Sequence, residues 1–180
     1  MRNDMQGSVL PIIYVRRRPG FRTQGWLMAG GKQVRVAIGR SGILANKREG
    51  DGGTPRGRFR LVRLWWRADR APRPRTLLPV RRIGRHDGWS EDPMDRLYNR
   101  PIRVPDKAPG DRLWRQDGLY DFIIELDHNT RPRVAGRGSA VFIHVAREGF
   151  MPTAGCVALP APRLQRLLER VGPRTRIVIQ

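Results

Sequence analysis

The stretch SAVFIHVAREGFMPTAGCVALPAPRLQRLLERVG, residues 139–172, joins a run typical of a buried strand to the clearest helix in the sequence. Residues 140–146 are rich in Val, Ile and Phe, which predicts a strand. Residues 160–172 carry leucines at helical spacing, with prolines before them and a Gly-Pro pair at the end, which predicts a helix. The only cysteine of the chain, Cys156, lies in the connection between the two elements.

Five more runs of β-branched and aromatic residues, bounded by Gly, Pro, Asp or Asn, predict further strands. They are residues 8–15, 34–38, 58–66, 120–126 and 175–179. A turn-rich connector joins the run 120–126 to the expected strand 140–146, so these two strands are expected to be neighbours. The segments 40–58 and 67–118 are rich in Gly, Pro and Arg without a sustained period, which predicts long functional or poorly ordered loops. We therefore expect one mainly β domain over residues 1–180, with long loops and a few short helices, one of them after the cysteine.

The composition allows one hydrophobic core and leaves the partner open. The 180 residues are 39% apolar, which is enough for the core of one domain. The formal net charge of +20 is carried almost entirely by arginine and attracts anionic polymers, namely nucleic acid, anionic lipid surfaces or the acidic polymers of a bacterial wall. The alternative is arginine spread over every face, because no block of charge dominates. A single cysteine excludes a disulfide within the chain, and no run approaches the length of a membrane span.

Cys156 and His144 form the candidate catalytic pair. His144 stands at the end of an expected strand, and the loop between the two residues is long enough to fold back and set the imidazole beside the thiol. A neighbouring histidine raises the thiolate fraction and carries the proton to a leaving amine. Gly155 lets the backbone turn tightly and brings N–H groups close to a reacting carbonyl. The alternative is that Cys156 is a small buried hydrophobic residue and His144 a core or rim residue.

Read together, FIHV and PTAGCVAL resemble the catalytic signature of the YkuD-like L,D-transpeptidase family, in its short stand-alone branch with a TAGC motif. Three upstream segments resemble parts of the same family in the same order. They are GRSGILANKREGDGGTPRGRFRL at 39–61, DGWSEDPMDRLYNRPI at 87–102 and LWRQDGLYDFIIELDHN at 113–129. The resemblance covers about residues 35–180 and implies a β-sandwich or barrel with long loops.

Two positions depart from patterns common in that family. Many members have a histidine before Gly-Cys, where this chain has Ala154, and this removes one substrate contact. The tryptophan motif, commonly WCDDP, is WSEDP here, so Ser90 and Glu91 provide no second thiol. Neither departure touches the histidine and cysteine pair.

The resemblance implies a cysteine acyltransferase acting on peptidoglycan stem peptides. Cys156 would form a thioester with His144 as base and acid, release terminal D-alanine and pass the acyl group to an amine, as in a 3-3 cross-link. It implies oxyanion donors among the backbone N–H groups of Gly155, Cys156 and Val157, and a backbone carbonyl, with Gly138 or Ser139 the nearest candidates, that orients His144. The other residues expected at the cleft are Thr153, Tyr98, Asn99, Trp89 and Asp121. Carbapenems acylate many relatives, and no cofactor is expected.

Other functions stay open from the sequence. Hydrolysis by the same pair predicts an L,D-carboxypeptidase or a peptidase that cleaves cross-links, and an inert thiol predicts a basic module that binds wall polymer or nucleic acid. Nucleic acid is the weaker partner, because aromatic residues are poorly interleaved among the arginines. A zinc site would need His86, His128, His144 and Cys156, whose spacings match no short-range zinc pattern. EGDGGTPRGRF lacks the GxxxxGK[ST] pattern of a phosphate loop.

The expected location is also open. The resemblance implies action in the periplasm or at the cell wall, because the substrate lies outside the membrane. The beginning of the chain is polar and shows no export signal, so a cytoplasmic location is the alternative.

Overall fold

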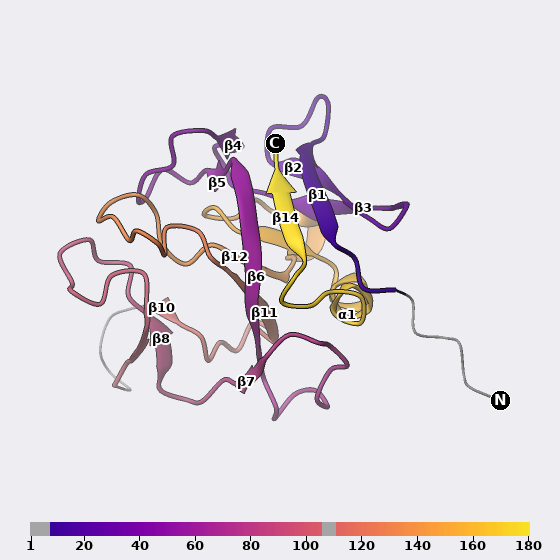
Figure 1. The fold of residues 1–180 in the computed structure, drawn as a ribbon. Coiled ribbons are helices and arrows are strands. Elements are labelled where there is room, and N and C mark those ends of the chain that lie inside the picture. The colour runs from indigo at the N-terminus through magenta and orange to yellow at the C-terminus, as the bar shows by residue number, and fades with distance from the viewer. Residues whose placement is uncertain (1–7, 106–110) are drawn as a thin grey trace.

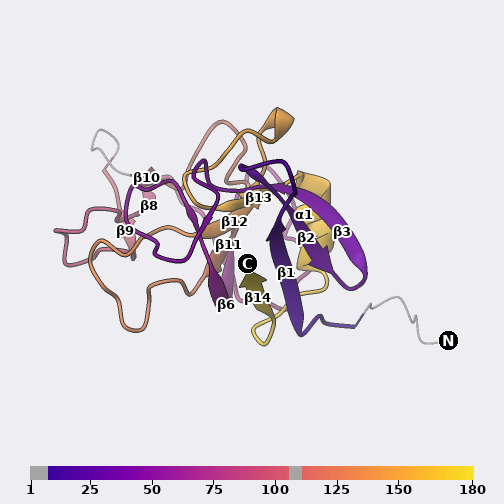
Figure 2. The same ribbon diagram turned by 90° about the horizontal axis from the view of Figure 1, so that it is seen from above.

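One large β-sheet organises the molecule, as the computed structural model shows for residues 8–105 and 111–180 (Figures 1 and 2). The strands of this sheet are β1 (Ile12–Arg17), β2 (Gln24–Ala29), β3 (Lys32–Ala37), β6 (Gly57–Trp66), β7 (Val80–Arg82), β11 (Phe122–Leu126), β12 (Phe142–Val145), β13 (Val157–Leu159) and β14 (Arg176–Ile179). Their order is β11-β12-β13-β3-β2-β1-β14-β6-β7, and a further pairing of β11 with β6 closes the sheet into a barrel-like ring with β7 outside it. The expected mainly β, barrel-like fold is confirmed.

The long strand β6 makes this closure, because it is long enough to pair with two neighbours. Its first residues pair with β14 and its later residues with β11, in both cases antiparallel. A register shift at the end of β11 marks a bulge, which bends the ladder where the ring closes. The expected neighbours at 120–126 and 140–146 are β11 and β12, which pair antiparallel, so that prediction is confirmed.

The central strands have buried side chains on both faces, because two hydrophobic clusters lie on opposite sides of them. Side chains alternate along a strand, so Ile123 and Ile124 of β11 face opposite sides. Ile124 belongs to the larger cluster, together with Ile143 and Val157, while Ile123 belongs to a smaller cluster that includes Cys156. The smaller cluster is the floor of the candidate site.

The helix after the cysteine, α1 (Ala161–Leu168), packs Leu164, Leu167 and Leu168 into the larger cluster. It ends earlier than the expected residue 172. The carbonyl of Arg170 accepts a hydrogen bond from the N–H of Leu10, so the chain leaves the helical path there to tie down the segment before β1. A short 3-10 helix, η1 (Glu148–Phe150), lies between β12 and the cysteine. No helix in the described ranges has the length and hydropathy needed to cross a membrane.

The segments expected to be long loops contain short strands. In 40–58, β4 (Ile43–Leu44) pairs in parallel with β5 (Thr54–Pro55). In 67–118, β8 (Asp87–Trp89) lies between β9 (Pro101–Arg103) and β10 (Asp111–Arg112) in a separate three-stranded sheet. Residues 106–110 of that expected loop lie outside the described residues. These strand pairs were not predicted from the sequence, because a strand of two or three residues is too short to show an alternating pattern.

Three strands of the main sheet were also missed, namely β2, β13 and the short β7 within 67–118. The sequence of β2, QGWLMA, has no β-branched residue, yet it pairs along its whole length with β3 and over residues 25–28 with β1. Gly25 permits the close approach to β1, since a Cβ there would lie 2.7 Å from the carbonyl oxygen of Arg16. β13 directly follows Cys156 and was read only as an apolar connection to the helix. Tertiary pairing overrides weak local propensity in β2 and β13.

Candidate active site

Cys156 and His144 are brought to one face of the sheet by the pairing of β12 with β13. These strands are parallel, and Ile143 is opposite Val157 while His144 is opposite Ala158. Ile143 and Val157 point into the larger cluster, so the alternating side chains, His144 and the neighbouring Cys156, face the other side. Both line one pocket of about 340 Å³. Two larger pockets of the described residues, of about 600 and 390 Å³, are lined by neither a cysteine nor a histidine.

The imidazole of His144 is held by a backbone carbonyl. Its Nδ1 lies 2.8 Å from the carbonyl oxygen of Val145, and its ring meets that of Tyr120 edge-on with centroids 5.3 Å apart. When Nδ1 donates to this carbonyl, Nε2 keeps its lone pair and can accept a proton. The carbonyl therefore belongs to Val145, and the expectation of Gly138 or Ser139 is wrong, because the ring turns towards its own strand.

The pKa of His144 is far below that of a free imidazole. Burial lowers this pKa to about 4, and the cationic Arg115 and Arg147 add to the effect against the opposing hydrogen bond to Val145. The imidazole is therefore neutral throughout the neutral pH range and is available as a base.

The thiol of Cys156 is also neutral at rest. Burial raises its pKa to about 12, the carboxylates of Asp111 and Glu91 act in the same direction, and the N–H of Phe142 and the Lys47 ammonium oppose them. Sγ accepts a hydrogen bond from Phe142 N–H at 3.4 Å and donates to the carbonyl of Ala140 at 3.2 Å. Among the described residues, no hydrogen bond joins Sγ to the imidazole of His144. At rest the pocket thus holds a neutral thiol and a neutral imidazole.

This resting state predicts slow alkylation of the free enzyme. A thiol with a pKa of about 12 has a thiolate fraction about 10³-fold lower at neutral pH than one with the ordinary value of 9.0. We expect the rate of carbamidomethylation by iodoacetamide to rise about tenfold per pH unit from pH 7 to 10. A rate that is already level across pH 6 to 8, measured by intact mass, would instead show a preformed thiolate–imidazolium pair.

The turn that carries the cysteine is tied by Thr153. The Thr153 hydroxyl donates to the carbonyl of Cys156 at 2.6 Å and accepts from Gly155 N–H at 3.1 Å. Gly155 has φ +148°, and a Cβ there would lie 2.8 Å from the carbonyl oxygen of Gly53. Glycine is required at this position, and the N–H of Gly155 is already used inside the turn.

The Gly-rich loop at 39–57 lies behind this turn and supports it. The segment at Gly39 forms a bridge with Thr153, and the N–H of Arg40 donates to the carbonyl of Thr153. A Cβ on Gly39 would lie 2.2 Å from the carbonyl oxygen of Gly52, so backbone meets backbone here.

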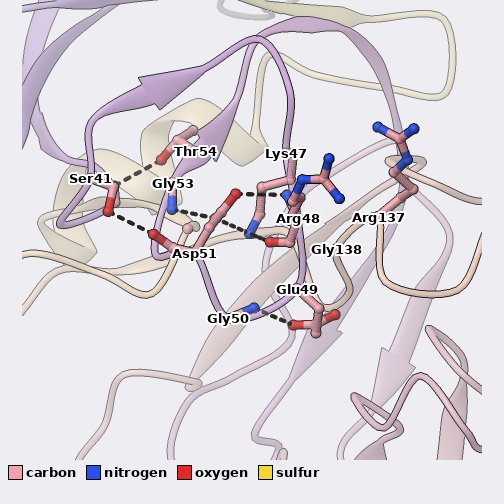
Figure 3. Close-up of polar contacts among 12 residues, drawn as sticks. Ser41, Lys47, Arg48, Glu49, Gly50, Asp51, Gly53, Thr54, Arg137 and Gly138 are labelled. Carbon is pink, nitrogen blue, oxygen red and sulfur yellow. Dashed lines mark hydrogen bonds and ion pairs between the residues drawn. The ribbon is translucent and has the colours of Figure 1, made fainter.

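Asp51 is the centre of hydrogen bonding in the loop (Figure 3). Its carboxylate accepts from the buried Lys47 ammonium at 2.6 Å, from Arg48 N–H at 2.6 Å and from Gly53 N–H at 2.8 Å. Burial opposes the ionisation of Asp51, but these hydrogen bonds outweigh it and hold its pKa below the ordinary value. The Lys47 side chain lies close to Gly155, with Cε 3.6 Å from the place of a Cβ. The loop thus places one buried cation close to the turn that carries Cys156.

Three residues expected at the cleft lie behind it. Trp89 Nε1 donates to the side-chain oxygen of Asn99 at 3.0 Å, and Ala140 N–H donates to the same oxygen at 3.1 Å. The ring of Trp89 packs edge-on against Phe142 at 5.0 Å between centroids. Tyr98 donates to Glu49 at 2.5 Å. All three are buried and none lines the thiol pocket, because they hold the segment that precedes β12.

Of the other residues expected at the cleft, only one lines the thiol pocket. Thr153 lines the thiol pocket, whereas Asp121 lines a separate pocket of about 390 Å³ and pairs with Arg70 at 3.2 Å. The carbonyl of Gly138 accepts from the Asn129 amide at 2.9 Å, and Ser139 is buried before β12. Neither Gly138 nor Ser139 lines the thiol pocket.

The sequence reasoning missed the charged and aromatic wall of the pocket. The pocket is lined, besides His144 and Cys156, by Tyr120, Arg115, Arg147, Glu91 and Asp111. Burial raises the pKa of Asp111 to about 6. Glu91 lies at the rim of the pocket and is exposed to solvent. Its pKa is nevertheless raised, first by desolvation among the lining residues and then by the neighbouring carboxylates of Asp111 and Glu49. Tyr120 and Arg115 fall in a segment that resembles the family, which was the available signal.

The zinc alternative needs His86, His128, His144 and Cys156 to converge. Within residues 8–105 and 111–180, no group of three or more His, Cys, Asp or Glu side chains is arranged to hold a metal ion.

Comparison with known families places this geometry in context. The model of the L,D-transpeptidase catalytic domain family, YkuD, matches residues 14–179. No curated protein and no solved structure matches the chain. The match begins earlier than residue 35, where the motif resemblance begins, and so includes most of β1 and all of β2, which carry no motif but contribute to the barrel core. Since the match covers nearly the whole chain, including the pocket with His144 and Cys156, this chain belongs to the YkuD family of L,D-transpeptidase catalytic domains.

Proposed function

We propose that this protein is an L,D-transpeptidase that acts on peptidoglycan stem peptides through a thioester on Cys156. The observation that carries the proposal is the shared pocket of a thiol and a neutral imidazole whose Nδ1 lies against the Val145 carbonyl. Membership of the YkuD family supports the reaction class and the peptide substrate.

The first half-reaction forms the thioester. Nε2 of His144 accepts the thiol proton while Sγ bonds to the carbonyl carbon of the residue before the terminal D-alanine. The tetrahedral intermediate collapses, the C–N bond breaks, and His144 passes the proton to the nitrogen of the leaving D-alanine. In the second half-reaction an acceptor amine attacks the thioester, its proton moves to Nε2, and the thiol is restored.

The oxyanion donors follow from the hydrogen bonds around the turn. Gly155 N–H already donates to Thr153, and Val157 belongs to the ladder between β12 and β13. Among the described hydrogen bonds none uses the N–H of Cys156, so this group is the main donor in the proposal. The hydroxyl of Tyr120, in the wall of the same pocket, is the second. Such preorganised donors contribute about 3 kcal/mol each in acyl-transfer enzymes.

The charges of the pocket suit a peptide that brings both carboxylates and an amine. Arg115 and Arg147 provide cations for carboxylates of the donor peptide, and Asp111 and Glu91 provide acidic groups for the amine of the acceptor. This arrangement favours transfer to an amine over transfer to water, because the amine is attracted to the site where it reacts.

The experiment that tests the proposal uses the purified protein with a tetrapeptide donor, with and without a second stem peptide that carries a free amine. We expect release of D-alanine and a cross-linked dimer when the acceptor is present. Tripeptide without dimer would favour the L,D-carboxypeptidase alternative. A folded protein that releases no D-alanine and forms no acyl-enzyme, by intact mass, would favour a basic binding module and contradict the proposal.

Two further parts of the proposal concern inhibitors and location. A carbapenem is expected to acylate Cys156, since its strained carbonyl meets the same thiol. The proposed place of action is the periplasm or the cell wall, because the proposed substrate lies there. Fractionation of cells with an antibody against this chain would test the location.

A further inference from the structure

A second pocket, larger than the one that contains the thiol, lies elsewhere on the described part of the molecule. It has a volume of about 600 Å³, within the range of small-molecule sites, and includes Arg17, Arg22, Arg56, Phe21, Ile43 and Gln180 in its lining. It sits at one end of the barrel, where the ends of β1 and β14 meet the start of β6 (Figure 1). Nothing in the proposed acyl transfer uses this pocket.

Three arginines come to this pocket from three different segments. Arg17 ends β1, Arg22 lies in the turn between β1 and β2, and Arg56 lies between β5 and β6. All three are exposed, and within the described ranges none of their guanidinium groups has a hydrogen bond or an ion pair. No acidic residue lines the pocket. Three cations therefore gather around one cavity without a protein partner.

The surrounding sheet strengthens this field. The five adjacent strands β3, β2, β1, β14 and β6 contain no Asp or Glu, although they carry several arginines. Arg60 and Arg63 of β6 do pair with acids, Asp127 at 3.9 Å and Glu125 at 3.1 Å, whereas the three arginines of the pocket have no such pair among the described residues. The potential around the pocket is therefore positive and attracts anions to it.

The arrangement of the guanidinium groups selects the kind of anion. One guanidinium satisfies a planar carboxylate by a bidentate contact, whereas a tetrahedral phosphoryl group presents oxygens in several directions. Three arginines that reach the pocket from three different segments are suited to the tetrahedral phosphoryl group. The volume exceeds that of one phosphate, and the apolar side chains of Phe21 and Ile43 provide a wall for an attached group.

We propose that this pocket is a binding site for a ligand that carries a diphosphate or several phosphoryl groups, with Arg17, Arg22 and Arg56 as its anchors. Ser41 also lines it, one residue from Arg40, whose N–H donates to Thr153 beside the catalytic turn. The site and the thiol pocket are thus separate cavities linked by one short segment.

Inorganic pyrophosphate is the probe for this site, measured by isothermal titration at physiological ionic strength. We expect one-to-one binding, and we expect the triple variant Arg17→Gln, Arg22→Gln, Arg56→Gln to weaken it by about tenfold or more, since charge-assisted contacts to phosphate are strong. The matched control is Arg73→Gln, Arg75→Gln, Arg96→Gln, which removes the same charge from exposed arginines that do not line the pocket. The control is expected to change the affinity by less than about threefold.

Three outcomes would overturn the site. They are no binding of pyrophosphate to the wild type, equal weakening in both triple variants, and citrate binding as tightly as pyrophosphate. The second would assign the binding to diffuse charge, and the third would assign the pocket to carboxylates. Carbapenem adduct formation on Cys156 should be unchanged in the pocket variant, which checks its fold and separates this test from that of the proposed acyl transfer.

Discussion

Replacing Cys156 by serine is expected to abolish thioester formation and to lower the rate of D-alanine release by about 10³-fold or more. A serine hydroxyl is a far weaker acid than a thiol, and the base beside it is an imidazole whose pKa is only about 4. The measurement is the intact mass of the protein after incubation with a carbapenem or a tetrapeptide donor. Wild type should gain the mass of one acyl group and the variant none.

The fold should survive this change. The serine hydroxyl can take the place of the thiol as donor to the carbonyl of Ala140 and as acceptor from Phe142 N–H. The matched control is Met151→Leu, an exposed position on the rim of the same pocket, which should still form the adduct. An adduct of equal yield on the serine variant, with a native thermal unfolding curve, would remove Cys156 from the mechanism.

Replacing His144 by glutamine is expected to lower kcat/KM by about 10²- to 10⁴-fold, the usual contribution of a general base. Glutamine keeps much of the volume of the ring, so the buried site should stay packed. In the wild type the imidazole is neutral above its pKa of about 4, so the rate of acylation should be level from pH 8 down to about pH 5 and fall below that.

The variant should show a different pH profile, which a merely structural role would not produce. Without the base the thiol must ionise alone, and its pKa is raised to about 12, so the rate should climb about tenfold per pH unit between pH 7 and 10. His128→Gln is the matched control, because His128 lies outside the thiol pocket and contacts the carbonyl of Arg137. If the acylation rate were independent of pH in both the wild type and the His144 variant, the role of His144 as general base would be contradicted.

Strong local patterns made much of the fold predictable. The runs that became β6, β11, β12 and β14 combine β-branched and aromatic residues with turn residues at both ends. The leucines of α1 repeat at helical spacing. By contrast, β2 and the short strands of 40–58 and 67–118 have weak propensity and exist because neighbours supply their hydrogen bonds.

The candidate site was likewise only partly predictable from the sequence. Cys156, Gly155 and His144 were found from their residue types and motif, because a nucleophile, its turn and its base lie close in sequence. Trp89, Tyr98 and Asn99 were assigned to the cleft, but they support it from behind through hydrogen bonds and ring packing. A motif identifies positions that matter without telling which side of the backbone a side chain takes.

The sequence by itself determined the fold class, the candidate catalytic pair and the small-residue turn that carries the thiol, because these depend on residue type and local order. Only the tertiary structure decided that the pair is neutral at rest, that Val145 holds the imidazole, and that charged side chains from 91 to 147 form one wall. Burial, pKa and convergence depend on distances between residues far apart in the chain. The arginine pocket at the barrel end belongs to this second kind, since its three cations are neighbours only after the strands have paired.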